Sequence, residues 1–106
     1  MTDKRVVLTT AESQDEARKI ARVLVDRQLA ACVNISGPIE SVYRWQGKVE
    51  DATEWLLIIK TTAAAFERVR DAIRELHSYE LPECIALEVM AGSEGYLSWI
   101  AENVKV

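Results

Sequence analysis

The segment of residues 31–61 constrains the fold of this 106-residue chain more than any other part. It is rich in β-branched, aromatic and other apolar residues, and its tight-turn signal, Gln46-Gly47, lies in the middle. This composition predicts two long strands joined as a hairpin. A continuous strand over residues 31–45 would reach about 45–50 Å, since a strand rises about 3.3 Å per residue. A domain of this size has a radius of gyration of only about 13 Å, so the hairpin should project beyond it even with a bend at Gly37-Pro38.

The hairpin also predicts an oligomer. Its tip carries Tyr43, Arg44 and Trp45, and a group of large side chains such as these is rarely left in water. The returning strand, residues 55–59, is apolar without alternation, which indicates that both of its faces are buried. Helices can cover one face, but the chain has no further strands for the other. We therefore expect a neighbouring subunit to receive the hairpin and to cover that face.

Shorter patterns predict the first strand and the first helix. Residues 5–10 form a short apolar segment typical of a strand. The sequence Ser13-Gln-Asp-Glu16 is a capping box, in which the serine oxygen accepts from one free amide and the glutamate reaches back to another. A helix should follow, with one buried face made of apolar residues at helical spacing: Ala17, Ile20, Ala21, Leu24, Val25 and Leu29.

The second half of the chain predicts two further helices and one strand. Thr62 can cap a second helix, which should end near His77-Ser78 because Pro82 follows shortly afterwards. Residues 83–90 alternate as a last strand does, and Gly92-Ser93 precedes a short third helix. This order predicts an α+β fold, a ferredoxin-like βαββαβ sandwich with an extra C-terminal helix, in a single domain over residues 1–106.

Charge and hydropathy exclude several classes of protein. The formal net charge of −4 argues against a partner such as nucleic acid or an anionic membrane, which requires a basic face. The chain has no run of 18 apolar residues, so we expect no membrane span. The apolar region near the N-terminus is too short for a signal peptide, which favours a cytoplasmic protein.

Several separated blocks of the chain resemble, in order and spacing, the CutA family of divalent-cation tolerance proteins. The blocks are residues 30–35, 43–47, 59–61, 76–79, 82–83 and 92–99. The resemblance implies a PII-like homotrimer in which sheets pack around a threefold axis and each hairpin extends onto a neighbour. It also implies metal binding at Cys32, His77 and Glu83. Two departures from the family pattern are Cys84, where isoleucine is usual, and the lack of a proline near Glu88.

The residues give little sign of catalysis. The glycines match neither a dinucleotide-binding nor a phosphate-binding loop, so no organic cofactor is expected. The only histidine is His77, which rules out a multi-histidine zinc site within one chain. An acyl-phosphate hydrolase on the same topology would need a phosphate cradle in its first loop, where residues 9–12 offer no arginine or glycine. We therefore predict that the protein is not an enzyme.

The candidate metal site comprises Cys32, His77, Tyr79, Glu83 and Cys84. Thiolate and imidazole are ligands that select copper and zinc, and a carboxylate adds a harder donor. The alternative is structural, because a cysteine in a strand packs as a small hydrophobic residue and a histidine at a helix end is favoured as a cation.

Two functions therefore compete. In the first, a trimer binds Cu²⁺ or another divalent cation weakly and acts in metal tolerance as a sensor or adaptor. In the second, a PII-like signalling trimer binds a small anionic ligand in the clefts between subunits, with Lys60 and Arg44 as the anion contacts. Tyr43 and Trp45 would then be a ligand platform, whereas their alternative role is packing between subunits.

Overall fold

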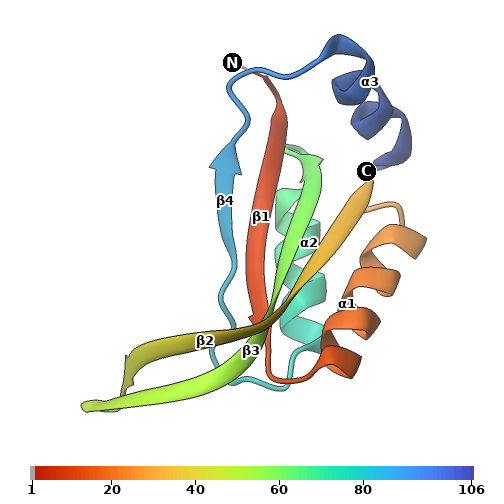
Figure 1. Cartoon of the computed structure of the whole chain (residues 1–106). Helices are drawn as coiled ribbons and strands as arrows, with labels where there is room; N and C mark the ends of the chain where they lie inside the picture. The colour runs from red at the N-terminus through yellow and green to blue at the C-terminus, as the bar shows by residue number, and fades with distance from the viewer. Residues whose placement is uncertain (1) are drawn as a thin grey trace.

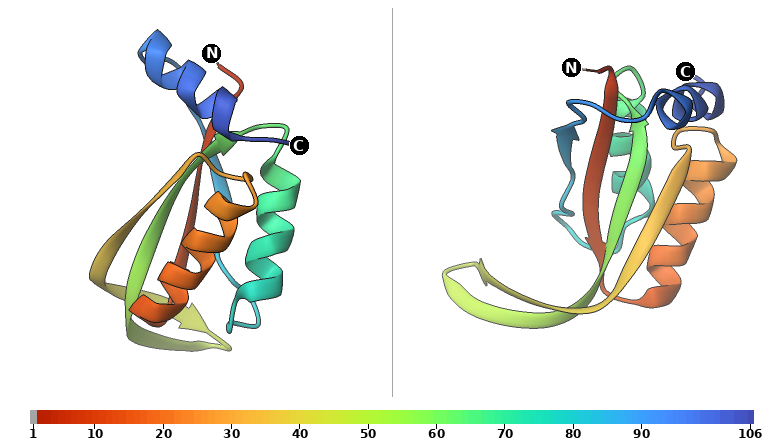
Figure 2. Two further views of the ribbon diagram at one scale, coloured as in Figure 1. Left: turned by 90° about the vertical axis from the view of Figure 1, so that its right-hand side faces the viewer. Right: turned by 45° about the horizontal axis from the view of Figure 1, so that its top comes forward.

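A computed structural model describes residues 2–106 and contains one four-stranded sheet and three helices (Figure 1). The elements are β1 (Lys4–Ala11), α1 (Gln14–Asp26), β2 (Cys32–Trp45), β3 (Lys48–Thr62), α2 (Phe66–Leu76), β4 (Ile85–Glu88) and α3 (Glu94–Asn103). The strands are antiparallel in the order β2-β3-β1-β4, and α1 and α2 lie on one face of the sheet (Figure 2). The predicted ferredoxin-like sandwich with an extra C-terminal helix is confirmed.

The β2–β3 hairpin projects from the body of the molecule, as the right-hand view of Figure 2 shows. It makes the molecule 44 Å long against 25 Å and 22 Å in the other directions. At its tip Trp45 pairs with Lys48 across the two-residue turn. Gln46 and Gly47 have φ angles of 50° and 81°, as a type I′ turn requires at both central positions. The predicted overshoot and turn are therefore confirmed.

A bend divides the hairpin into two halves. The register between β2 and β3 shifts between Ser36 and Ile39, which marks a bulge at Gly37 and Pro38. A Cβ atom on Gly37 would lie 2.5 Å from Cδ1 of Trp55, so this bend has no room for a side chain. The bend brings the distal half of the hairpin toward the loop between α2 and β4.

The two faces of the sheet are covered unequally. The core lies between the sheet and the helices, and its largest buried side chains are Val7, Leu57 and Ile59 from strands and Ile20, Leu24, Val69 and Ile73 from helices. On the opposite face, Leu8 pairs with Ile58 and with Ile85, and these side chains are only partly buried. The helices of the same subunit thus cover one face of residues 55–59. That a neighbouring subunit covers the other face stays a prediction.

The ends of α1 differ from the prediction. The Oγ of Ser13 accepts from the N–H of Glu16 at 3.1 Å, so the cap itself is confirmed. The Glu16 carboxylate does not reach back to the cap but accepts from the backbone N–H and the hydroxyl of Ser78, at 3.0 and 3.1 Å. Val25, predicted on the buried face, is 43% exposed, because it lines an open cavity between α1 and the edge strand β2 instead of packing in the core.

The boundaries of two later elements also differ. Helix α2 begins at Phe66 rather than directly after Thr62, whose Oγ1 accepts from the N–H of Ala65 at 3.3 Å in the preceding turn. Strand β4 spans only Ile85–Glu88, where the sequence predicted residues 83–90. Glu83 and Cys84 precede this strand, and Glu83 lines a cavity while Cys84 packs against the core.

Candidate functional site

A cavity of about 360 Å³ lies where the distal half of the hairpin meets the loop between α2 and β4. The hairpin contributes two aromatic side chains and one acid, and the loop contributes most of the rest. The lining residues are Thr10, Tyr43, Trp45, Glu54, Tyr79, Glu80, Leu81 and Glu83. Tyr43 and Trp45, which are 42% and 36% exposed, therefore face a cavity of their own subunit. The volume is within the range usual for small-ligand sites.

One wall of this cavity is fixed by a pair of polar side chains. The hydroxyl of Tyr79 donates to Oε2 of Glu54 at 2.7 Å. Glu54 is only 7% exposed, so this hydrogen bond serves a carboxylate that has little access to water. Burial and the hydrogen bond to Glu54 both raise the pKa of Tyr79, which keeps the hydroxyl protonated as a donor. The Glu54 carboxylate is thereby held at the edge of the cavity.

The charges around the cavity are all negative. Partial burial raises the pKa of Glu83, and the nearby charge of Glu54 raises it further. Glu80 adds a third carboxylate to the lining, which includes no lysine or arginine among the described residues. Acids that repel one another favour a bound cation, because the cation relieves both the repulsion and the desolvation. The faces of Tyr43 and Trp45 are also attractive to cations.

His77 is buried behind this cavity, and its side chain has no exposed area. Its Nε2 lies 2.5 Å from the carbonyl oxygen of Thr10, and its Nδ1 accepts from the backbone N–H of Tyr79 at 3.0 Å. Because both ring nitrogens have partners, neither is free to ligate a metal in this conformation. The ring also packs on Tyr79, with the centroids 4.7 Å apart. The geometry therefore favours a structural role for His77, but through hydrogen bonds that position Tyr79 rather than through a favourable charge at the helix end.

Cys32 lies on the face of the sheet away from α1 and α2. It is opposite Lys60 in the β2–β3 register, and Nζ of Lys60 is 3.8 Å from its Sγ. Lys60 also donates to the side chain of Asn34. Among residues 2–106, no three histidine, cysteine or acidic side chains converge as metal ligands. The structure therefore does not bring Cys32 together with His77 and Glu83 within one subunit.

Two other predicted site residues also lie apart from the cavity lining. Arg44 donates to the carbonyl of Gly47 at 3.3 Å, across the turn at the hairpin tip. Cys84 packs against the core near Arg70 and Arg74, and burial raises the pKa of its thiol despite those charges. Such a thiol is less reactive than an exposed one with an ordinary pKa.

The sequence analysis identified one part of this site and missed another. Tyr43, Trp45, Tyr79 and Glu83 line one cavity as a group, although they come from two distant segments. Glu54 and Glu80 were missed. The sequence feature that could have indicated Glu54 is its position directly before the apolar residues 55–59, because a carboxylate next to a buried strand segment is itself partly buried.

These features define a class of protein: a ferredoxin-like α+β domain with a projecting, bent hairpin whose tip closes an acidic and aromatic cavity. Comparison with known proteins then places the chain in one family. The family model described as "CutA1 divalent ion tolerance protein" matches residues 5–103, and the chain belongs to this family.

Relatives of known name agree with this assignment. The chain is 46% identical over 100 residues to the "Divalent-cation tolerance protein CutA" of Thermus thermophilus, covering 94% of this chain and 97% of that one. It is 41% identical over 93 residues to human "Protein CutA", covering 88% of this chain but only 52% of the human protein. These names describe tolerance to divalent cations or the family alone, not a reaction.

Solved structures show the same fold. CutA1 from Thermus thermophilus superposes with a TM-score of 0.94 at 45% identity, covering 96% of this chain and 99% of that chain. CutA from Xylella fastidiosa superposes with a TM-score of 0.95 at 39% identity, covering 98% of this chain and 100% of that chain.

Relatives are described as periplasmic in Archaeoglobus fulgidus and chloroplastic in Arabidopsis thaliana, so the cytoplasmic location of this chain stays a prediction. None of the helices within residues 2–106 has the length and apolar character needed to span a membrane.

Proposed function

We propose that this protein contributes to divalent-cation tolerance by binding a divalent cation weakly in the acidic cavity of each subunit. The observation that carries this proposal is the pair Glu54 and Glu83, two partly desolvated carboxylates on one cavity with no basic residue in the described lining. The family name supports a role connected with divalent cations.

The donor set indicates what kind of cation would bind. Carboxylate oxygens suit hard divalent cations such as Mg²⁺ and Mn²⁺, which are often held by one or two carboxylates and retain several waters. Two carboxylates make a weak, readily exchanging site, as a sensor or adaptor of cation level requires. Copper would be drawn instead to the thiol of Cys32, which lies on the other face of the sheet.

We further propose that the protein works as a trimer. The partly buried apolar side chains on the free face of the sheet, among them Leu8 and Ile58, need a cover that this chain does not supply. Ile85 and Leu87 on the neighbouring edge strand are 50% and 49% exposed, which extends the same surface. A copy of the chain packed on this face would bury it, as in the PII-like arrangement that the family resemblance implies.

The alternative, a small anionic ligand held by Lys60 and Arg44, is less well supported. Neither residue lines the acidic cavity, and each already donates to an oxygen of its own chain. Those two residues also lie at opposite ends of the hairpin, so one small anion cannot reach both within a subunit. An anion site using them would require a second subunit.

Isothermal titration calorimetry with Mn²⁺, Zn²⁺ and Cu²⁺ tests the cavity proposal. Wild type should bind one Mn²⁺ per subunit, and Glu83→Gln should weaken this at least about tenfold, because a charged ligand is lost. Glu88→Gln is the matched control, since it removes the same charge from an exposed position on β4 outside the cavity. Equal affinities in Glu83→Gln and Glu88→Gln would reject the cavity as the site. Cys32→Ser should change copper binding only.

A further inference from the structure

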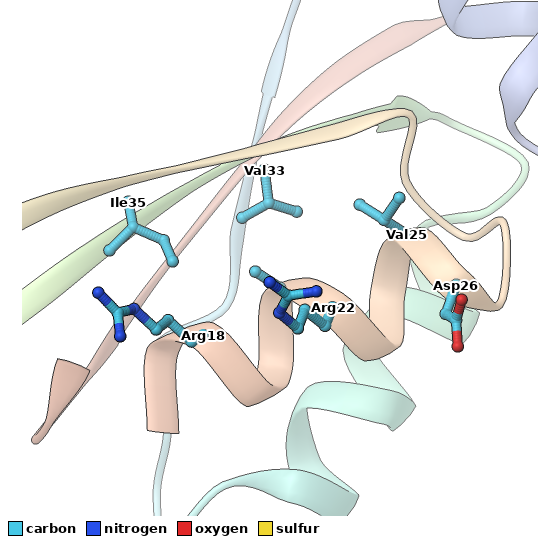
Figure 3. Close-up of a pocket in the computed structure, with 7 residues that line it drawn as sticks. Arg18, Arg22, Val25, Asp26, Val33 and Ile35 are labelled. Carbon is cyan, nitrogen blue, oxygen red and sulfur yellow. The ribbon is translucent and has the colours of Figure 1, made fainter. Parts of the chain in front are cut away.

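A second cavity, of about 500 Å³, lies on the other side of the molecule, between α1 and the edge strand β2 (Figure 3). We call it the α1–β2 groove. It combines a basic rim with an apolar floor, and its lining residues are Arg18, Ala21, Arg22, Val25, Asp26, Val33 and Ile35. None of these residues lines the acidic cavity.

The basic rim is formed by two arginines one helical turn apart. Figure 3 shows the guanidinium groups of Arg18 and Arg22 on the side of α1 that faces Ile35 and Val33. Neither arginine forms an ion pair within 4 Å in the part of the chain that the structure describes. Asp26 lies at the far end of the groove, beyond Val25 in the same view. The two guanidinium groups are therefore available to an external anion.

The floor of the groove is apolar and incompletely covered. Val25 is 43% exposed although it follows the apolar face of α1, and Val33 and Ile35 are only partly buried. Because β2 is the edge strand, no further strand of the described chain covers this side. The groove lies between the sheet and the helix layer, away from the free sheet face through which we expect the trimer to form.

We propose that the α1–β2 groove binds a small organic anion with an apolar body, such as a medium-chain carboxylate. Arginine pairs with carboxylate in a bidentate geometry, and two arginines at this spacing can share one head group. The apolar body would lie on Val25, Val33 and Ile35 and remove their exposed surface from water. The site thus differs in charge and position from the acidic cavity, and it does not depend on cation binding there.

The test is a titration of the ¹⁵N-labelled full chain with octanoate, followed by NMR. Octanoate should produce saturable shifts at the amides of Val25, Val33 and Ile35. Acetate, which lacks the apolar body, and octanol, which lacks the charge, should each bind at least about tenfold more weakly. A parallel titration with octyl phosphate shows whether the groove prefers a carboxylate or accepts any anionic head group. Saturable binding of either octanoate or octyl phosphate supports the proposal.

Two double variants complete the experiment. Arg18→Gln/Arg22→Gln should weaken octanoate binding at least about tenfold, because both head-group contacts are lost. Arg70→Gln/Arg74→Gln is the matched control, with the same spacing and charge loss on α2. Equal binding by both double variants, equal binding of octanol and octanoate, or no saturable shift at millimolar octanoate would overturn the proposal. Concentration-dependent shifts of the groove amides without ligand would also overturn it, since another copy would then cover the groove.

Discussion

Removal of one hydroxyl group at the acidic cavity should have a measurable effect on stability. Tyr79→Phe deletes the donor that lies 2.7 Å from Oε2 of Glu54. Hydrogen bonds to charged groups contribute about 1.5–3 kcal/mol, and Glu54, at 7% exposure, has little water to replace the lost donor. Because the cavity itself can admit water, we expect the lower part of that range, about 1.5–2 kcal/mol. The contact of the aromatic ring with His77 should remain.

Urea unfolding at pH 7 and one fixed protein concentration measures this effect as a change in the free energy of unfolding. Tyr43→Phe is the matched control, because Tyr43 lines the same cavity but its hydroxyl makes no hydrogen bond within the described residues. It should change the free energy by less than about 0.5 kcal/mol. Excess Mn²⁺ should restore part of the stability of Tyr79→Phe, since a cation gives Glu54 a new partner. Equal stabilities of the two variants would refute the assigned role of the Tyr79–Glu54 pair.

Three further predictions concern the same region. Glu83→Gln should stabilise the cation-free protein, because it removes a charge that burial and Glu54 both disfavour. The gain should be no more than about 0.5 kcal/mol, since solvent screens a carboxylate that is partly exposed. Because the pKa of Glu83 is raised, the folded wild type holds the carboxyl proton of Glu83 more tightly than the unfolded chain does. The stability of the wild type should therefore fall as the pH rises from the pKa of Glu83 in the unfolded chain through its higher pKa in the folded protein, and pH-dependent unfolding of the variant should lack this component. Gly37→Ala should destabilise the hairpin by about 1–3 kcal/mol in urea unfolding, since the new methyl group overlaps Trp55; wild-type stability would contradict this. Trp45→Ala should lower the thermal midpoint in a way that depends on protein concentration, and an unchanged midpoint at every concentration would exclude the hairpin tip from a subunit interface.

The hairpin and the sandwich were predictable because their signals are local and periodic. A long β-rich segment with one turn signal admits few other structures, and the two glycines that shape it, Gly37 and Gly47, mark the bend and the turn. Helical spacing likewise predicted the buried face of α1, except at Val25. That exception arises because spacing predicts which way a side chain points but not whether another element covers it.

The candidate site was predictable only in part, because its chemistry depends on contacts between distant segments. Ligand type suggested that Cys32, His77 and Glu83 act together, yet Cys32 lies on the free sheet face and His77 is hydrogen-bonded to Thr10 and Tyr79. Glu54 acquires its importance from Tyr79, which lies 25 positions away along the chain. Such a pairing has no signature in the spacing of a single sequence.

The central claim is that the acidic cavity binds a divalent cation, and paramagnetic Mn²⁺ tests it most directly. Mn²⁺ broadens the NMR signals of nearby nuclei, and the effect falls steeply with distance. Added in small amounts to the ¹⁵N-labelled protein, it should first broaden the amides of Tyr79, Glu80, Leu81, Glu83 and Glu54, and Mg²⁺ in excess should reverse the effect. Broadening that begins around Cys32 and Lys60, or that spreads evenly over the acidic surface, would contradict the account.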